Sequence, residues 1–548
     1  FRDIVNAANK TSGACPECGN INPEQIFSII ETKVVNEYGR LTSVRKISAG
    51  QWYQYFKQKI RVKRQEHSQE SLPAVHTNSN WINQFRTYFV RDVLAKVANK
   101  QYLWMILLEA PVLAFFIAFM VKYYNVLTDG SYSFHSNSNV PVYFFMCVVV
   151  ALFLGLIVSA EEIFRDKKIR KREQFLNLSA SSYLLSKVSV MFIISAVQTF
   201  LLMIVGNLIL EIPLTEMRYW FILFSVSCFA NVLGLNISSG FNSAVTIYIL
   251  IPVLVIPQLL LSGVVINFDR FNPAVGKPVG IPLMGEIMTS RWAFEAFMVT
   301  QFKDNPYEKK FYELDQTIAM ADYKRVYYIP QLESRLAYCI NHPQGWNNPN
   351  DTRMTETFKL LQHELKNELR LTGGDKLPEV EQIGTGQFDS LVYRKSMHYL
   401  SVLKRAYARQ MDEAVRKREK LIAYYTSTPE EEKNFERFRK RYVNEAVTDA
   451  VKNISAAERI VEYDGSLIQK IYPIYQLEHQ PRHLFDFTAN LYQPTKHFMG
   501  RYVDTLVFNI AVIWTMTVIL FITLYLDLIR KIMNRWEGQV KHRRKQQA

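Results

Sequence analysis

One stretch of this chain constrains its fold more than any other. Residues 219–268 contain no Asp, Glu, Lys or Arg, and residues 188–210 and 505–526 are equally free of charge. About 20 apolar residues at 1.5 Å each span the ~30 Å hydrocarbon core of a bilayer, so these runs are typical of membrane-spanning helices. We therefore expect an integral membrane protein, and the pattern excludes a purely soluble or intrinsically disordered chain.

Six spans are predicted. They cover residues 102–123, 142–160, 188–210, 219–240, 244–266 and 505–526. The longest run is too long for one span, and it is divided at 238–243, where small and polar residues cluster. The predicted fold class is an all-α polytopic membrane protein with six transmembrane helices and a large, mainly helical extracytoplasmic domain between spans five and six.

The charge distribution predicts which parts face the cytoplasm. The net charge is +15, of which residues 267–504 carry +2 and the remaining residues, which hold the spans, carry +13. Basic residues gather in the 161–187 loop and in the tail after residue 526, as the positive-inside bias of cytoplasmic loops predicts. We therefore expect both termini inside and 267–504 outside. A basic excess confined to these loops argues against a nucleic-acid partner.

The chain order then predicts the organisation of the molecule. The expected parts are a polar linker at 36–80, an amphipathic helix at 81–100, spans one to five at 101–266 with the cytoplasmic loop 161–187, an extracytoplasmic domain at 267–504, and span six with a basic cytoplasmic tail at 505–548. Five cysteines are too few for a disulfide scaffold. The chain opens with Phe1, and we expect it to be the downstream piece of a longer polypeptide or a processed form of one.

The segment before the first span has an amphipathic pattern. Phe85, Phe89, Val93 and Val97 recur every four residues, and basic residues flank them. This pattern predicts a helix lying along the inner membrane surface. A soluble helix packed on a domain is the alternative reading.

The external segment contains two long helical patterns, 388–427 and 430–463. Between them, Thr428 suits a helix N-cap, Pro429 suits the first turn, and three glutamates follow at the positive end of the helix dipole. We expect an antiparallel helical hairpin over 388–463, about 50–60 Å long.

Four segments resemble the G-type (White-like) ABC exporters. They are Cys-Pro-Glu-Cys-Gly-Asn-Ile-Asn-Pro-Glu-Gln-Ile-Phe at 15–27, the amphipathic helix at 82–100, the loop at 161–187, and Pro-Leu-Met-Gly-Glu-Ile to Arg-Trp-Ala-Phe-Glu-Ala at 282–296. The sequence departs from the family where Glu-Gln-Ile replaces Ala-Asp at 24–26, and where about 305–500 forms a large insertion.

The resemblance implies roles for particular residues. It implies that 1–35 is the tail of an ATP-binding domain and that the 161–187 loop couples ATP-driven closure to the spans. The implied coupling residues are Glu161, Glu162, Phe164, Arg165, Tyr183 and Lys187, and those of the connecting helix are Phe85, Phe89, Arg91, Val93 and Asn99. For the loop residues, an ordinary charged cytoplasmic surface is the alternative reading.

The resemblance also implies partners and cofactors. An ATP-binding domain, a second copy or homologous half forming a dimer, and membrane lipid are the implied partners. The large external domain adds an envelope protein as a further candidate partner. ATP and Mg²⁺ would be held by the ATP-binding domain. The 548 residues themselves lack the G-x-x-x-x-G-K-[ST] sequence that cradles phosphates. A multi-pass protein of a bacterial cytoplasmic membrane is the expected setting.

Several polar residues inside the predicted spans are candidates for a substrate path. Glu109 is the sole acid in a predicted span, and the neutral candidates are Gln198, Asn207, Asn231 and Asn236. An intramembrane carboxylate suggests function, whereas polar side chains between helices usually link them. Both readings stay open.

No catalytic residue and no metal ligand is predicted. Cys15 and Cys18 form a C-x-x-C pair, but zinc needs four ligands and no second pair follows. His479 and His483 are separated by Pro481, so they are not expected to share a helix face.

Three classes of function are compatible with these features. The first is a permease of an ATP-driven exporter for an amphiphilic or lipid-like substrate. The second is a non-transporting sensor or scaffold whose external helices bind an envelope partner. A membrane-embedded enzyme is the third, and the absence of a Ser/His pair or clustered carboxylates in the spans argues against it.

Overall fold

A computed structural model describes most of the chain. The described residues are 23–59, 80–124, 130–173, 178–213, 217–276, 280–348, 350–373, 377–384, 386–476, 484, 486–487, 489–535 and 539. The chain divides into two units, Phe1–Asn78 and Ser79–Ala548, and each is described by itself.

The first unit contains two helices and one β-hairpin among its described residues. In order they are α2 (Pro23–Ile30), β1 (Lys33–Val35), β2 (Leu41–Arg45) and α3 (Ala49–Lys59). The strands pair antiparallel, and the Asn36 side chain closes their turn by accepting a hydrogen bond from the Arg40 amide at 2.8 Å. The expected polar linker over 36–80 thus contains a β-strand and a helix, β2 and α3, and its role as a linker stays a prediction. Residues 60–79 lie outside the described part.

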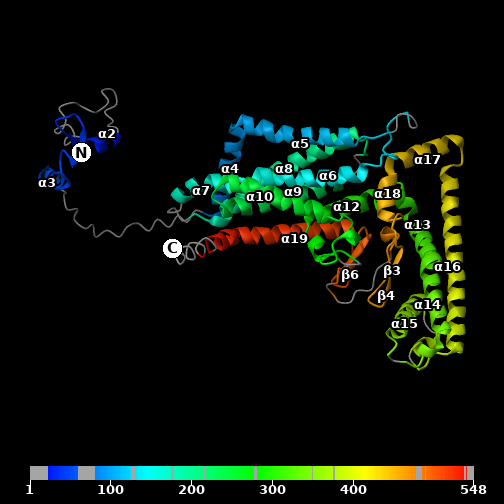
Figure 1. Cartoon of the computed structure of the whole chain (residues 1–548). Helices are drawn as coiled ribbons and strands as arrows, with labels where there is room; N and C mark the ends of the chain where they lie inside the picture. The colour runs from blue at the N-terminus through cyan, green and yellow to red at the C-terminus, as the bar shows by residue number, and fades with distance from the viewer. Residues whose placement is uncertain are drawn as a thin grey trace. The chain divides into compact units, whose positions relative to one another are not determined.

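The second unit begins with a series of helices that includes the apolar ones. They are α4 (Trp81–Ala98), α5 (Lys100–Val121), α6 (Val140–Ala160), α7 (Glu162–Glu173), α8 (Ala180–Ile209), α9 (Arg218–Gly240), α10 (Ala244–Leu260) and, at the end, α19 (Thr505–Tyr525). Five of the described helices, those containing α5, α6, α8, α9 and α19, are long and apolar enough to cross a membrane (Figure 1). This confirms an all-α membrane protein.

The fifth predicted span is shorter than expected. α10 has 17 residues and ends at Leu260, whereas the prediction continued to residue 266. At 1.5 Å per residue it is about 25 Å long, at the lower limit for a bilayer. Its Ile247, Ile251 and Val255 are buried, so one face of this helix packs on the others.

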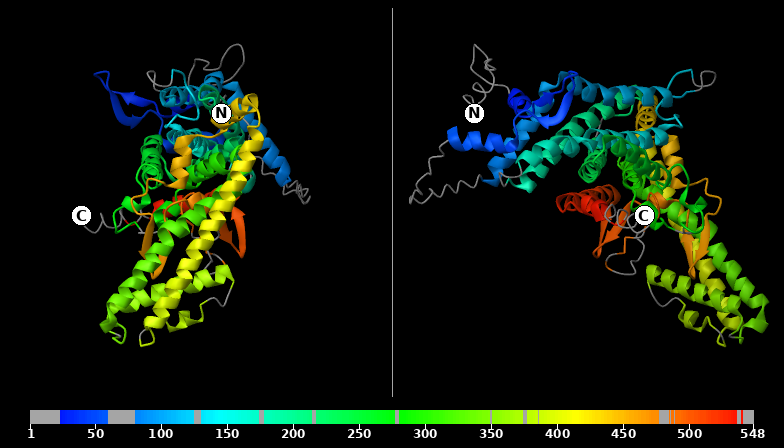
Figure 2. Two further views of the ribbon diagram at one scale, coloured as in Figure 1. Left: turned by 90° about the vertical axis from the view of Figure 1, so that its right-hand side faces the viewer. Right: turned by 60° about the vertical axis from the view of Figure 1, so that its left-hand side comes forward.

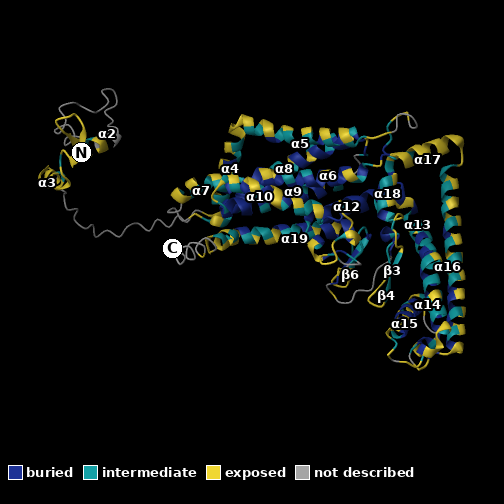
Figure 3. Ribbon diagram, in the orientation of Figure 1, coloured by how far each residue is buried: buried dark blue, intermediate teal, exposed yellow. Residues whose placement is uncertain are grey.

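The centre of this unit is the contact between α6 and α9. Both helices are largely buried, whereas α5 and α10 are mostly exposed (Figure 3). Gly155 permits the close approach, because a Cβ there would lie 2.5 Å from the Ser227 carbonyl oxygen. Small residues at helix crossings serve this purpose in membranes, where association depends on close packing.

A second group of elements lies between α10 and α19. The helical elements are η2 (Phe268–Arg270), α11 (Leu283–Glu286), α12 (Thr289–Lys303), α13 (Glu308–Tyr323), the π-helical η3 (Lys324–Tyr328), α14 (Ile329–Asn341), η4 (Pro343–Gly345), α15 (Thr352–Thr372), η5 (Pro378–Gln382), α16 (Ser390–Tyr425), α17 (Pro429–Tyr442), α18 (Glu445–Lys452) and η6 (Pro473–Tyr475). Two antiparallel hairpins accompany them, β3 (Ile460–Tyr463) with β4 (Ser466–Gln469), and β5 (Thr495–Phe498) with β6 (Arg501–Asp504).

The predicted hairpin over 388–463 is wrong in its second arm. α16 is a single helix of 36 residues, but α17 has 14 residues and ends at Tyr442. Asn444 ends the helical run, because its side chain caps α18 and also donates to the Phe134 carbonyl at 2.6 Å. The antiparallel neighbours of α16 are instead α13 and α14 (Figures 1 and 2), joined to it by the ion pairs Arg418–Asp315 and Lys404–Glu333.

The start of α17 agrees with the prediction from its sequence. The Thr428 hydroxyl accepts a hydrogen bond from the Glu431 amide, and the Glu431 carboxylate accepts one from the Thr428 amide at 3.1 Å. This reciprocal capping box, with Pro429 in the first turn, confirms the predicted helix start.

α12 holds a buried charge cluster. Glu295 accepts hydrogen bonds from Lys496 Nζ at 2.7 Å and from Asn509 Nδ2 at 2.9 Å, and Arg291 pairs with Glu286 at 3.0 Å. These contacts connect α12 with α11, β5 and α19. Pairing of this kind is needed because an isolated charge in so dry a place is costly.

Candidate functional site

The junction between α6 and α7 is shaped by a side chain from α9. α6 ends at Ala160, and α7 begins two residues later at Glu162. The first amides of α7 lack partners within the helix, and the Ser238 hydroxyl accepts hydrogen bonds from the amides of Ile163 and Phe164 at 3.1 and 3.0 Å. α7 is thereby fixed to the end of α9.

Lys187 is the centre of a charged cluster between α4, α7 and α8. It lies in the second turn of α8 and is 5% exposed. Its ammonium group is 2.6 Å from Asp92 Oδ1, 3.0 Å from Glu162 Oε2 and 3.1 Å from Asp166 Oδ2. A second ammonium, that of Lys96, lies 2.5 Å from Glu162 Oε1. Three carboxylates and two ammonium groups therefore share a largely buried space.

Tyr183 closes one side of this cluster. Its hydroxyl donates to Asp166 Oδ2 at 2.9 Å. Its ring meets Tyr88 edge-on, with centroids 5.5 Å apart, and the Arg170 guanidinium lies 4.6 Å from its centroid. The cation–π contact adds to the attachment of α7 to α8.

α4 is attached to the same loop by further polar contacts. Arg91 pairs with Glu173, at the end of α7, at 2.8 Å. Trp81 Nε1 donates to the Ser181 hydroxyl at 2.9 Å, and the Ser179 amide donates to Gln84 Oε1 at 2.8 Å. α4 thus contacts α7 on one side of the 161–187 loop and the start of α8 on the other.

Five of the six predicted coupling residues fall into two groups, and the sixth, Phe164, is partly buried against the core of the spans. Glu162, Tyr183 and Lys187 are in the cluster. Glu161 and Arg165 are paired with each other at 2.7 Å instead, and the Arg165 side chain is 62% exposed. The prediction treated all of these residues as one group, because the sequence alone does not tell which residues in the first turn of α7 point toward the other helices.

The predicted connecting-helix residues also have distinct positions. Phe89 and Val93 pack with residues of α5, α6 and α8, and Phe85 stacks between Trp81 and Phe89. Asn99 accepts a hydrogen bond from the Tyr102 amide at 3.1 Å and so caps α5.

The prediction of a stripe facing the membrane is therefore corrected. Phe89 and Val93 face protein because α5, α6 and α8 pack against them, and Phe85 stacks on its neighbours within α4. The apolar residues of α4 that are exposed form another row, consisting of Ile82, Val90, Leu94 and Val97.

Sequence reasoning missed four residues of the site. Asp92 and Lys96 face the cluster from α4, Asp166 faces it from α7, and Ser238 caps α7. Asp92 could have been noticed, because it is the sole acid between residues 81 and 100 and lies four positions before Lys96. Ser238 sits in the uncharged run, where nothing in the sequence indicates that it caps another helix.

The polar residues inside the spans mostly link helices. Asn207 accepts a hydrogen bond from Tyr143, Gln198 donates to the Ile106 carbonyl, and Asn231 donates to Ser195. Asn236 donates to the Leu520 carbonyl of α19 and accepts from Thr523.

Glu109 differs from these neutral residues. It is half-buried in α5, and it has no hydrogen bond or ion pair with any residue that the structure describes. Its predicted alternatives, a structural acid or a functional one, stay predictions.

The residues considered for metal binding lie elsewhere. Cys15, Cys18, His479 and His483 are all outside the described residues. Within the described ranges, His, Cys, Asp and Glu form no group of three or more that could hold a metal ion. What the cluster around Lys187 offers is a rigid connection between three helices.

Comparison with known proteins agrees with this architecture. Residues 83–302 match the family described as the ABC-2 type transporter. The chain is also similar to the ABC transporter ATP-binding/permease protein Rv1747 of Mycobacterium tuberculosis (strain ATCC 25618 / H37Rv), with 29% identity over 163 residues. That alignment covers 28% of this chain, and the chain spans 18% of the length of the relative.

Proposed function

We propose that the chain is the permease part of an ATP-driven ABC exporter of the G-type, because residues 83–302 match the ABC-2 type transporter family. The cluster around Lys187 is the observation that carries the proposal. A transporter must convert closure of cytosolic ATP-binding domains into movement of its spans, and a stiff element between two spans does this directly. α7 leads out of α6, and the Glu162–Lys187 contact ties it to α8.

The cluster would transmit motion because it is buried and multiply paired. Displacing α7 alone would separate Glu162 from Lys96 and Lys187, leaving buried charges without partners. Breaking a buried pair by removing one partner typically costs about 3–5 kcal/mol, so moving α4, α7 and α8 together is the less costly response. A push on the 161–187 loop is therefore passed to the spans.

The proposal includes partners that supply the chemistry. An ATP-binding domain, on the same chain or another, would bind ATP and Mg²⁺, and a second copy or a homologous half would complete a dimer. The 161–187 loop and both termini would face the cytoplasm, consistent with the basic residues of that loop. The setting would be a bacterial cytoplasmic membrane.

The substrate we propose is an amphiphilic or lipid-like molecule. The predicted spans have few ionisable side chains, with Glu109 as their sole acid. Such a surface suits an apolar substrate better than a strongly hydrated one.

Reconstitution tests this function. The chain would be placed in liposomes together with its ATP-binding domain, and the movement of fluorescent phospholipid analogues between leaflets would be followed by dithionite quenching. We expect ATP-dependent movement by the assembly and none by residues 1–548 alone. ATP hydrolysis by residues 1–548 alone, or no ATP-dependent movement of any amphiphile by the assembly, would contradict the proposal.

A further inference from the structure

A cleft of about 630 Å³ opens beside the end of α17 in the second unit. One wall is formed by the segment before α6 and the turn after α8. α17 forms the other wall with Arg437, Lys440 and Arg441. The volume lies within the usual range of small-molecule sites, about 300–1,000 Å³.

The wall formed by α17 is strongly basic and uncompensated. All three basic side chains are exposed, and none has an ion pair with a residue that the structure describes. Among the described lining residues, the carboxylate is that of Glu211, and Lys122 Nζ already lies 3.0 Å from it. The cleft therefore presents a net positive face to whatever enters it.

Basic residues at a helix C-terminus have an ordinary explanation. They interact favourably with the negative end of the helix dipole, which accounts for their presence in the last turns of α17. The dipole does not require them to border an apolar surface. Here the opposite wall presents Leu208, which is 61% exposed, among polar side chains that include Asn207 and Glu211. A basic wall facing an exposed leucine suits a ligand with an anionic group and a hydrocarbon part.

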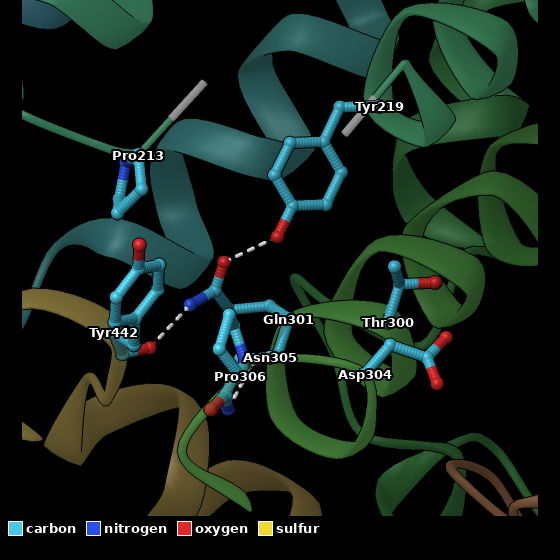
Figure 4. A pocket seen from close by; sticks show the side chains of 8 residues that line it. All are labelled: Pro213, Tyr219, Thr300, Gln301, Asp304, Asn305, Pro306 and Tyr442. Carbon is cyan, nitrogen blue, oxygen red and sulfur yellow. Dashed lines mark hydrogen bonds between the residues drawn. The ribbon is translucent and has the colours of Figure 1, made fainter. Parts of the chain in front are cut away.

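Hydrogen bonds outside the cleft hold the end of α17. In a neighbouring small pocket, which shares Pro213 with the cleft, Gln301 at the end of α12 donates through Nε2 to the Tyr442 carbonyl at 3.0 Å and accepts from the Tyr219 hydroxyl (Figure 4). Asn444 donates to the Phe134 carbonyl at 2.6 Å and to the Asn137 carbonyl at 2.9 Å. The end of α17 is thus fixed to α12 and to the segment before α6. Fixed walls lower the cost of ordering a bound ligand.

We propose that this cleft binds the anionic headgroup of a membrane amphiphile, with Arg437, Lys440 and Arg441 around the anion and Leu208 against the hydrocarbon part. The inference rests on the proposed function for one point, which is that the chain lies in a membrane with this cleft at the outer ends of the spans. It requires neither ATP nor transport.

Binding is measured on the full chain in detergent. The probes are dihexanoyl phosphatidylglycerol, dihexanoyl phosphatidylcholine and inorganic phosphate, each titrated while microscale thermophoresis is recorded. We expect phosphatidylglycerol to bind at least tenfold more tightly than either other probe. The triple variant Arg437→Gln, Lys440→Gln, Arg441→Gln should lose at least tenfold in affinity for phosphatidylglycerol, because charge-assisted hydrogen bonds to the anion are lost.

A matched control separates the site from overall charge. The triple variant Arg409→Gln, Arg416→Gln, Lys420→Gln removes the same charge from exposed positions on α16, and it should bind within twofold of the unaltered chain. Leu208→Ser should lower the affinity for phosphatidylglycerol and leave the affinity for inorganic phosphate unchanged.

Three results would overturn the inference. The first is equal affinity for phosphatidylglycerol and phosphatidylcholine. The second is an equal loss of affinity in the control variant on α16 and in the triple variant on α17. The third is binding of inorganic phosphate as tight as that of phosphatidylglycerol, which would indicate a site for free anions. Because no step uses ATP, a failure here leaves the transport assay unaffected, and the converse also holds.

Discussion

Glu308 is a carboxylate that is almost completely shielded from solvent. It begins α13, is 6% exposed, and its Oε2 has no hydrogen-bond partner among the described residues. Burial raises the pKa of Glu308 to about 7, and Asp315 adds to the effect while Lys452 and two arginines oppose it. A carboxyl with a raised pKa binds its proton more tightly in the folded protein than in the unfolded chain.

This asymmetry predicts a pH dependence of stability. The contribution of Glu308 to the free energy of unfolding is most favourable below about pH 4.5 and falls as the pH rises from there to about 7. Above pH 7 this contribution no longer changes with pH. The loss amounts to roughly 3 kcal/mol for about two and a half pH units. Glu308→Gln cannot ionise, so its unfolding temperature should exceed that of the unaltered chain at pH 8 and equal it at pH 4.5.

Thermal unfolding in detergent at the two pH values checks this expectation. Glu313→Gln is the control, because Glu313 is on the same helix and exposed. The same increase in unfolding temperature for both variants, or an increase that does not depend on pH, would refute the assignment.

Glu295 gives a second prediction for a single residue. It is fully buried and accepts from Lys496 Nζ, so Glu295→Gln would leave Lys496 and Arg291 without their shared carboxylate. We expect a loss of about 3–5 kcal/mol, visible as a lower unfolding temperature. Adding Lys496→Met should restore part of that loss, because the buried Lys496 ammonium is then removed, whereas Arg291 keeps its pairing with Glu286. If the double variant is as unstable as the sum of the two single ones, the pair is not coupled.

The sequence could not have revealed this pair. Glu295 and Lys496 are 201 positions apart, and no local pattern links their two segments. Their meeting depends on how β5 packs against α12, which no local pattern encodes.

At the scale of elements, the sequence predicts helix starts better than helix partners. The capping box at Thr428 is local, and it was predicted correctly. The end of α17 depends on Asn444, whose side chain contacts a segment more than 300 positions earlier in the chain. Tertiary contacts thus divided a region with continuous helical propensity, and the expected partner of α16 was replaced by α13 and α14.

α7 supplies a prediction at this scale. If the cluster transmits motion, Glu162→Gln should lower transport per ATP hydrolysed in the assembled transporter, because one buried attachment of α7 to α4 and α8 is weakened. Arg165→Gln should leave that ratio unchanged, since Arg165 is exposed and paired within its own turn. The measurement is ATP hydrolysis and lipid movement on the same proteoliposomes.

The comparison between the two variants decides the matter. Both variants must first show equal expression, and the ratio is measured at a temperature below the unfolding temperature of the less stable variant. An equal effect of both variants on the ratio, or no effect of Glu162→Gln, would remove the coupling role from the cluster.

At the scale of the whole second unit, the two ends of α6 mark two sides. α7 follows its C-terminal end, whereas the segment before its N-terminal end contacts Asn444 next to α17. The 21 residues of α6 separate these regions by about 31 Å. The charge pattern and this separation together predict that residues 161–187 and 267–504 face opposite sides of the membrane.

Labelling of single cysteines tests the orientation. Cysteines placed at Lys171 and Ser427, both exposed, should react with a membrane-impermeant maleimide from opposite sides in intact cells and in inside-out vesicles. The described natural cysteines, Cys147, Cys228 and Cys339, are buried and give a low background. Reaction of both sites from the same side would contradict the predicted topology.

The pairing of Lys303 with Asp504 has a consequence for how the large insertion is carried. α12 ends at Lys303 and α19 begins at Thr505, so this contact joins the points where the polypeptide leaves and re-enters the bundle of spans. The 200 residues between these two points therefore begin and end at the same place on the bundle of spans. A loop closed at its base places little strain on its anchors when its length changes, because closure entropy grows slowly with length. The length of this insertion can therefore vary while α12 and α19, the two helices that anchor it, keep their positions relative to each other.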